Sequence, residues 1–207
     1  KENLFLMSKD GVISYIDINA INGTNFRTKI IPNNLKKLIS YDDWWSKPGG
    51  KGLKDLLIND GKIYISYTNL IGKDCYNTSI LVAEISFDVL KFEKFFEPPT
   101  CLNVRVGYNR WSYNSGGGKL FSLDNDHLLF SHGGFKTRVK AQDDSSVFGK
   151  IILINKNSKE WSIVSKGHRN VQGLFYNSES NLIINTEHGP LGGDEININK
   201  LYEQKEK

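Results

Sequence analysis

The sequence predicts an all-β fold, and three observations lead to that prediction. β-Branched and aromatic residues, which favour strands, are plentiful, and aromatic residues alone make up 12% of the 207 residues. Short apolar runs are separated by the turn-forming residues Gly, Asn and Asp, and the chain contains 19 Gly. No window shows the sustained periodicity of a long amphipathic helix, and the best short helix candidate is 33–39.

One hairpin pattern recurs three times along the chain. An apolar run, a polar turn and a second apolar run follow one another at residues 52–67, 118–131 and 173–186. The second and third copies begin about 55 residues apart, near the upper end of the repeat lengths of propeller blades. Further strand candidates, such as 150–155 and 159–164, lie between these copies. About four strands per repeat form a propeller blade, so we expect a β-propeller rather than a sandwich, with about four blades in this chain.

Composition excludes several classes of protein. The 27 basic and 23 acidic residues leave a net charge of +4, which is too small and too evenly spread for a nucleic-acid or polybasic membrane surface. No apolar run approaches the ~20 residues of a spanning helix, so we expect no transmembrane segment. The chain begins at Lys1 without an initiator Met and ends in the polar run 200–207. We therefore expect a processed or partial chain, a single propeller domain over 1–207 that is truncated at its C-terminal end.

The two cysteines, Cys75 and Cys101, bracket two strand candidates, 79–87 and 90–96. If these strands pair, their outer ends bring the two sulfur atoms close together. A lone pair of cysteines without CxxC spacing or a nearby His is a poor zinc site. Two interpretations stay open, a disulfide formed in an oxidising compartment and two unpaired buried thiols. The disulfide would favour a periplasmic or secreted protein.

Two dense polar clusters, 167–173 and 187–197, flank the third hairpin copy. Loops at the end of such a unit gather on one face of a propeller, around its channel. The guanidinium of Arg169 suits a carboxylate or a polarised carbonyl, and Asn170 and Gln172 add directional amide contacts. Gly189 and Pro190 force an irregular backbone whose carbonyls can face a hard cation such as Ca²⁺. For the acidic and amide residues 194, 195 and 197 we expect a structural role in tying the loop down.

These clusters resemble the paired signatures of the soluble glucose/sorbosone dehydrogenase family, the quinoprotein aldose sugar dehydrogenases. The family pattern reads Gly-His-Arg-Asn-Pro-Gln-Gly and then Glu-His-Gly-Pro-x-Gly-Gly-Asp-Glu-Ile-Asn, and the visible change here is Val171 in place of Pro. Looser matches lie at 141–151 and 50–53, so the resemblance spans residues from about 48 to 198. The resemblance implies a six-bladed propeller that binds pyrroloquinoline quinone (PQQ) and Ca²⁺, of which this chain would cover about four blades.

The resemblance also implies a role for each matched residue. Arg169 and Asn170 would contact the quinone together with Gln172, and Arg169 would act in catalysis by stabilising negative charge on the reactive carbonyl oxygen. The backbone carbonyls of Gly189 and Pro190 would hold the Ca²⁺. The implied reaction oxidises a small-molecule aldose at its anomeric hydroxyl to the lactone.

The chain departs from the family pattern in two ways. The family's catalytic base is a His ahead of a strand start, and the matching stretch, 112–120, contains no His. Asn114 or Ser115 stands at that position. His132, one strand away, is either a substitute base or a hydrogen-bonded structural residue. In addition, the family's later blades supply basic residues to the cofactor, so a partner segment or the missing blades would be needed to complete the propeller.

Three functional hypotheses follow from the sequence. The first is a PQQ-dependent aldose sugar dehydrogenase, and the second is a catalytically silent propeller that binds without turnover. In the third, the polar clusters only brace the corners of blades. The pair Trp44-Trp45 fits none of them specifically, because it can be core, a sugar-stacking platform or an interface, and core is the default.

Overall fold

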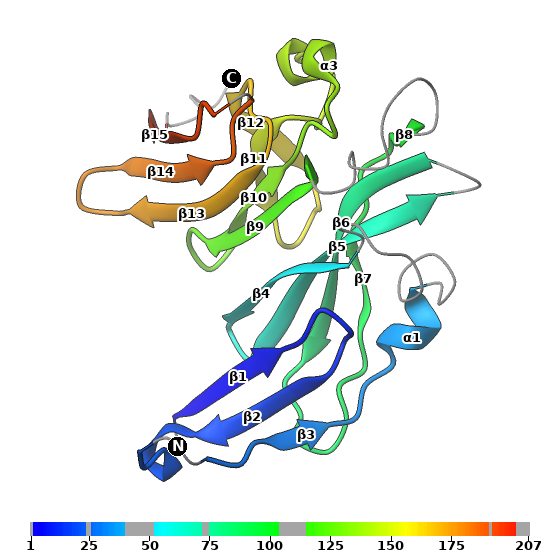
Figure 1. Cartoon of the computed structure of the whole chain (residues 1–207), viewed down its shortest axis with the longest axis vertical. Helices are drawn as coiled ribbons and strands as arrows, with labels where there is room; N and C mark the ends of the chain where they lie inside the picture. Colours follow the sequence, from blue (N-terminus) through cyan, green and yellow to red (C-terminus); the bar gives the residue numbers. More distant parts are fainter. Residues whose placement is uncertain are drawn as a thin grey trace.

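The computed structural model describes residues 2–23, 26–39, 52–71, 75–103, 115–190 and 192–201. These residues form four antiparallel sheets that follow one another along the chain (Figure 1). The first sheet contains β1 (Asn3–Met7), β2 (Ile13–Asp17) and β3 (Lys29–Ile31). The second contains β4 (Leu53–Asn59), β5 (Lys62–Ile71), β6 (Cys75–Glu84) and β7 (Glu93–Phe96), with β8 (Leu102–Asn103) paired to the start of β6.

The third and fourth sheets carry most of the predicted functional residues. The third contains β9 (Gly117–Ser122), β10 (His127–His132), β11 (Lys150–Asn155) and β12 (Trp161–Lys166). The fourth contains β13 (Val171–Asn177), β14 (Leu182–Glu187) and β15 (Glu195–Lys200). A 3-10 turn, Ile18–Ala20, and two short helices, α1 (Leu35–Leu38) and α3 (Arg138–Gln142), lie between the strands.

The three predicted hairpin copies are confirmed as the first two strands of the second, third and fourth sheets. They are β4–β5, β9–β10 and β13–β14, and each pair is antiparallel. The turn between β4 and β5 consists of Asp60 and Gly61, whose φ angles of 48° and 69° are the left-handed conformations that a two-residue hairpin turn requires. The recurrence in the sequence therefore marks the start of each blade.

Apolar layers fill the space between successive sheets. Ile13 and Leu81 lie in the layer between the first and second sheets, and Leu129 and Ile183 lie in the layer between the third and fourth. The neighbouring β11 residues Ile151 and Ile152 belong to different layers, because successive strand residues point to opposite faces. The two middle sheets are thus covered on both faces, as the blades of a propeller are, and the predicted all-β propeller architecture is confirmed.

The short helix expected at 33–39 is present as α1, and α3 was not expected. Only Ala141 of α3 is buried, so the sequence of α3 has no apolar stripe that would indicate a helix. Its position is fixed instead by the fully buried Lys150, whose Nζ donates to the carbonyls of Lys140 (2.9 Å), Ala141 (2.8 Å) and Phe148 (3.0 Å). This contact, made by the first residue of the following strand β11, is invisible to sequence periodicity.

Cys75 and Cys101 form a disulfide, with their Cα atoms 5.3 Å apart. Cys75 begins β6, which pairs with β7 further along and with β8 at its start, where Cys75 lies opposite Asn103. The chain therefore runs back along β6 through β7 and β8, which places Cys101 beside Cys75. The pairing of the two strand candidates predicted this proximity.

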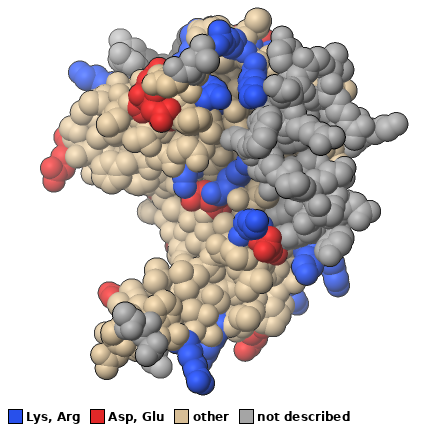
Figure 2. Space-filling view, in the orientation of Figure 1, with Lys and Arg blue, Asp and Glu red and all other residues tan. Residues whose placement is uncertain are grey.

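The four sheets form an open arc, with the first and fourth sheets at its two ends (Figure 1). Figure 2 shows a notch between these end sheets, and on this face the basic and acidic side chains are scattered rather than gathered by sign. The outer faces of the end sheets expose large apolar side chains, including Ile30 (69% exposed) on β3 and Ile196 (74%) and Ile198 (64%) on β15. Across the part of the chain that the structure describes, no helix is both long and apolar enough to cross a membrane. Trp44-Trp45 lies outside the described residues.

Candidate functional site

The predicted site residues lie where the first strands of three neighbouring sheets begin. The backbone amide of Gly117, at the start of β9, donates to Oδ1 of Asn170, which directly precedes β13 (3.1 Å). The next residue, Gly118, packs on the side chain of Lys54 at the start of β4 so closely that a Cβ at Gly118 would collide with it. The starts of β4, β9 and β13 are therefore neighbours at one end of the arc's inner surface.

The carboxylate of Glu187, at the end of β14, joins the two polar clusters. Its Oε2 accepts hydrogen bonds from the backbone amides of Arg169 (2.9 Å) and Asn170 (3.4 Å), and its Oε1 contacts Nδ1 of His168 (3.3 Å) and Nδ2 of Asn197 (3.2 Å). Burial by itself would raise the pKa of Glu187, but these hydrogen bonds and the His168 ring outweigh it and hold the pKa below its ordinary value. The buried carboxylate thus stays ionised and fixes the backbone of Arg169 and Asn170.

The side chain of Arg169 reaches the second cluster. Its Nη1 donates to the backbone carbonyls of His188 (3.0 Å) and Gly189 (2.5 Å). The structure therefore brings together a residue that the sequence assigns to the quinone and a carbonyl that it assigns to Ca²⁺.

Asn170 and Gln172 form a second polar pair beside Arg169. Oδ1 of Asn170 accepts from Nε2 of Gln172 (3.0 Å) as well as from Gly117, and the Asn170 carbonyl accepts from the amide of His188 (3.0 Å). Asn170 is buried, whereas Gln172 is exposed and lines a pocket of about 400 Å³ together with His188 and Asp194. Gln172 consequently stands at the rim of a cavity large enough for part of a small molecule, and its side chain is hydrogen-bonded to the buried Asn170.

The turn at Gly189 and Pro190 is braced by its own loop. The amide of Gly189 donates to Oδ1 of Asp194 (3.2 Å), and the amide of Gly193 donates to the carbonyl of Pro190 (3.1 Å). A side chain at position 189 would collide with the Gly193 carbonyl, so the turn requires Gly there. Asp194 also contacts Nδ1 of the exposed His188 (3.0 Å), and this is the loop-tying role expected for it.

The Gly189 carbonyl fits a cation, because it already faces the positive guanidinium of Arg169. The Pro190 carbonyl points back into the turn toward Gly193, so it fits a cation less directly. In the described ranges, no cluster of three or more His, Cys, Asp and Glu side chains is arranged to hold a metal ion. A calcium site at this turn would therefore depend on backbone carbonyls, ligands that Ca²⁺ accepts.

His132 has the geometry of the structural alternative. It is fully buried, its Nε2 accepts from the amide of Thr78 (3.0 Å), and its Nδ1 donates to the carbonyl of Gly133 (3.0 Å). Burial lowers the pKa of His132 to about 4, to which the charge of Lys150 contributes. Because both ring nitrogens are engaged and neither reaches solvent, we assign His132 no part in proton transfer. Of the two residues at the family's base position, Ser115 is buried and Asn114 lies outside the described residues.

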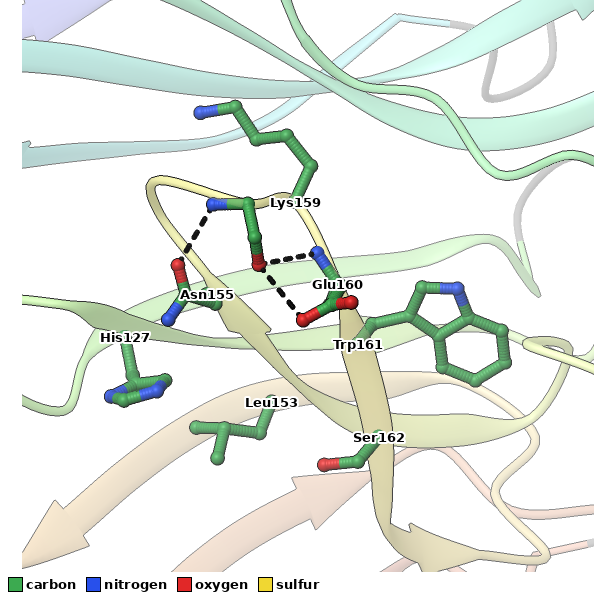
Figure 3. Close-up of a pocket in the computed structure, with 8 residues that line it drawn as sticks. His127, Leu153, Asn155, Lys159, Glu160, Trp161 and Ser162 are labelled. Atoms are coloured by element: carbon green, nitrogen blue, oxygen red, sulfur yellow. Dashed lines mark hydrogen bonds between the residues drawn. The ribbon is translucent and has the colours of Figure 1, made fainter.

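A larger groove of about 750 Å³ lies elsewhere on the third sheet. It runs beside the turn between β11 and β12, with His127 and Trp161 among its lining residues (Figure 3). None of the predicted site residues lines it, and the indole of Trp161 packs into the apolar layers on the other face of the sheet. The size of this groove alone does not connect it to the predicted site residues.

Sequence reasoning did not assign a role to Glu187 or His168, although both stand within the quoted motifs. His168 is buried, and its Nε2 contacts Oγ of Ser165 (2.7 Å), which completes a chain of polar contacts from β12 to Glu187. The sequence signal for Glu187 is its position at the last residue of a strand candidate, where a buried carboxylate needs hydrogen-bond donors from neighbouring loops. Which donors it meets depends on the packing of two loops.

Comparison with known proteins agrees with these observations. Residues 47–202 match the family described as Glucose / Sorbosone dehydrogenase. Over 182 residues the chain is 28% identical to the aldose sugar dehydrogenase YliI of Escherichia coli (strain K12), a match that covers 78% of this chain and 47% of that protein. It is also 35% identical over 105 residues to the uncharacterized protein slr1608 of Synechocystis, covering 40% of this chain and 26% of that one.

Solved structures share the fold. The apo form of the soluble aldose sugar dehydrogenase from Escherichia coli matches with a TM-score of 0.67 at 22% identity, covering 95% of this chain and 57% of that one. The PQQ-bound aldose sugar dehydrogenase from Streptomyces coelicolor also gives a TM-score of 0.67, at 19% identity, with coverages of 96% and 57%. The chain thus spans about half the length of these relatives. With its propeller blades and its paired polar clusters in place, the chain belongs to the glucose/sorbosone dehydrogenase family.

Proposed function

We propose that this chain is part of a PQQ- and Ca²⁺-dependent oxidoreductase that oxidises the anomeric hydroxyl of an aldose to the lactone. The observation that carries the proposal is the hydrogen-bonded network of Arg169, Asn170, Gln172 and Gly189, with Glu187 fixing the backbone of the first two. Because the chain spans only about half of its relatives, the complete protein's activity is part of the proposal.

The side chains of this network suit a quinone. The guanidinium of Arg169 would stabilise negative charge that develops on a carbonyl oxygen, and the amides of Asn170 and Gln172 would fix the orientation of the ring. The cofactor, when bound, supplies the hydride-accepting chemistry. The carbonyls of Gly189 and Pro190 would hold the Ca²⁺ beside it.

A binding module without turnover is the second candidate, and one observation favours it. Oxidation of an alcohol requires a group that takes the hydroxyl proton. No His stands in the segment 112–120, and both nitrogens of His132 are engaged. A chain of this kind could keep the cofactor contacts and lack the proton acceptor.

Two further features support proposals about the compartment of the protein and about what completes its propeller. The disulfide between Cys75 and Cys101 favours an oxidising compartment, the periplasm or the cell exterior. The exposed Ile196 and Ile198 on the fourth sheet and Ile30 on the first favour further blades, or a partner segment, that cover these faces and complete the propeller.

The experiment that tests the proposal is dye-coupled oxidation of aldoses by the full chain with added PQQ and Ca²⁺. Turnover that is lost in Arg169→Ala supports the dehydrogenase, with exposed Arg138→Ala on α3 as the matched control. Binding of PQQ without turnover of any aldose supports the binding module. Absence of both leaves the polar clusters as braces between blades and overturns the proposal.

A further inference from the structure

We propose that in the chain without cofactor the guanidinium of Arg169 occupies the cation position at the Gly189 carbonyl, and that Ca²⁺ binds there by displacing it. The displaced side chain then becomes available to the quinone, so Ca²⁺ binding and quinone binding are coupled through one arginine. This inference rests on the proposed function and adds a regulation of the same site.

The contacts of Arg169 define the position. Its Nη1 donates to two successive carbonyls, those of His188 (3.0 Å) and Gly189 (2.5 Å). Hydrogen bonds with a charged donor are short and strong, so the guanidinium satisfies an oxygen that a Ca²⁺ ion would otherwise take as ligand. Two positive charges on one carbonyl repel each other, and the guanidinium and the ion therefore exclude one another.

The surrounding backbone is held in place independently of the Arg169 side chain. The amide of Arg169 is bound by Glu187 (2.9 Å), the amide of Gly189 by Asp194 (3.2 Å), and the amide of His188 by the carbonyl of Asn170 (3.0 Å). These bonds keep both loops in register when the guanidinium leaves. The exchange of one cation for the other thus needs a rotation of one side chain and no change of fold.

The side chain of Arg169 is partly open to solvent. Arg169 is half-buried, whereas its neighbour Asn170 is buried, and His188, whose carbonyl the guanidinium contacts, lines the pocket of about 400 Å³. A Ca²⁺ ion at the Gly189 carbonyl makes the contact of the guanidinium with that carbonyl less favourable. An anionic or quinone oxygen nearby makes the displaced position of the guanidinium more favourable. By linkage, each ligand then strengthens the binding of the other.

The test measures Ca²⁺ affinity by calorimetry on the full chain without PQQ, for the wild type and for Arg169→Ala. Removal of the competing guanidinium is expected to tighten Ca²⁺ binding by roughly tenfold, the size of one charge-assisted hydrogen bond. Arg169→Lys keeps a cation on the side chain and should bind Ca²⁺ less tightly than Arg169→Ala. Arg138→Ala, an exposed arginine on α3, should match the wild type.

PQQ added to the same samples separates this inference from the proposed function. PQQ should raise the Ca²⁺ affinity of the wild type and leave that of Arg169→Ala unchanged. Unchanged or weaker Ca²⁺ binding by a folded Arg169→Ala chain overturns the displacement, whether or not PQQ binds. Wild-type chain that binds no PQQ, with Arg169→Ala still tighter for Ca²⁺, supports the displacement and contradicts the proposed function.

Discussion

The Glu187 carboxylate and the backbone amide of Arg169 are joined by a hydrogen bond of 2.9 Å between Oε2 and N. This bond connects the end of β14 to the loop that precedes β13, and it makes one site out of two clusters that are separate in the sequence. The same carboxylate reaches the amide of Asn170 (3.4 Å), so two successive site residues depend on one buried acid.

Glu187→Gln should therefore weaken PQQ binding by roughly tenfold or more, because the amide that replaces the carboxylate can no longer accept from all its donors. The measurement is a PQQ titration in Ca²⁺, with thermal unfolding recorded beside it to separate affinity from stability. Glu179→Gln, at an exposed acid in the turn between β13 and β14, is the control and should bind PQQ as the wild type does. Equal affinities of the two variants would mean that Glu187 does not position the site.

We expect His132 to make the free energy of unfolding decrease as the pH falls from about 6.5 toward 4. The folded chain holds His132 neutral down to about pH 4, whereas the unfolded chain protonates it near its ordinary value of 6.5. The unfolded state thus binds more protons in this window, and the full effect is on the order of 3 kcal/mol. Urea unfolding at pH 7.5 and pH 5 measures it. A His132→Gln chain should lose less stability between these two pH values, and the same loss in both chains would refute this assignment.

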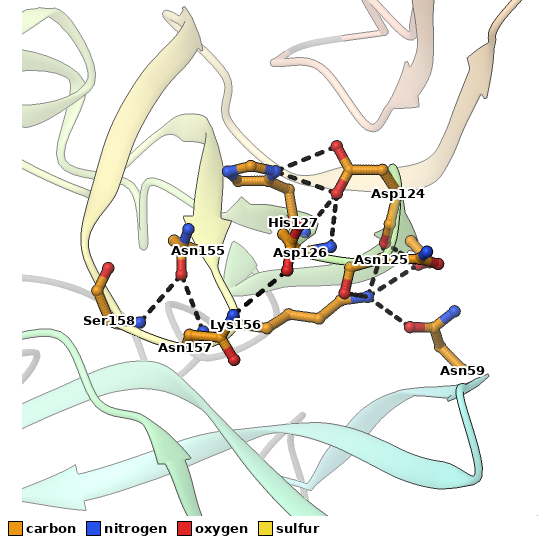
Figure 4. A network of polar contacts seen from close by, with 10 residues as sticks. Asn59, Asp124, Asn125, Asp126, His127, Asn155, Lys156, Asn157 and Ser158 are labelled. Atoms are coloured by element: carbon orange, nitrogen blue, oxygen red, sulfur yellow. Dashed lines mark hydrogen bonds and ion pairs between the residues drawn. The ribbon is translucent and has the colours of Figure 1, made fainter.

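Lys156 ties the second sheet to the third (Figure 4). Its buried ammonium donates to Oδ1 of Asn59 in the β4–β5 hairpin (2.5 Å) and to the carbonyls of Asp124 (2.7 Å) and Asn125 (3.1 Å) in the turn between β9 and β10. Burial lowers the pKa of Lys156, and the nearby carboxylates, Asp124 first, oppose that shift.

Lys156→Met should lower the free energy of unfolding by about 2 to 3 kcal/mol, because it leaves several acceptors without their charged donor. Lys140→Met removes an ammonium of the same kind from an exposed ion pair with Asp143 (2.9 Å), and such pairs contribute less than about 1 kcal/mol. Urea unfolding of both variants makes the comparison. Similar losses of unfolding free energy in the two variants would show that the Lys156 contacts between the two sheets stabilise the chain no more than a surface ion pair does.

The disulfide between Cys75 and Cys101 closes a loop with a sequence separation of 26. Replacing both cysteines with Ser should destabilise the chain by about 3 to 4 kcal/mol, since the open loop gains conformational entropy in the unfolded state. Thermal unfolding with and without reductant checks this, and the double variant should be insensitive to reductant. A wild-type chain whose unfolding temperature does not change on reduction would contradict the expected contribution.

The sequence predicted the parts of the fold that local chemistry determines. The hairpin turn at Asp60 and Gly61 and the apolar alternation around it are encoded within a few residues, so the blade units could be identified from the chain alone. Helix α3 escaped prediction because it is held by the buried Lys150 of the following strand, β11. The motif residues Arg169 and Gly189 were predicted separately, and their mutual contact became visible only when the loops were packed together.

A titration of the full chain with PQQ in Ca²⁺, followed by the absorbance of the quinone, tests the central claim most directly. The account predicts saturable, Ca²⁺-dependent binding that is lost in Asn170→Ala and retained in Arg138→Ala. Absence of binding by a folded wild-type chain, or binding that Asn170→Ala leaves unchanged, would contradict the assignment of this network of Arg169, Asn170, Gln172 and Gly189 as a quinone site.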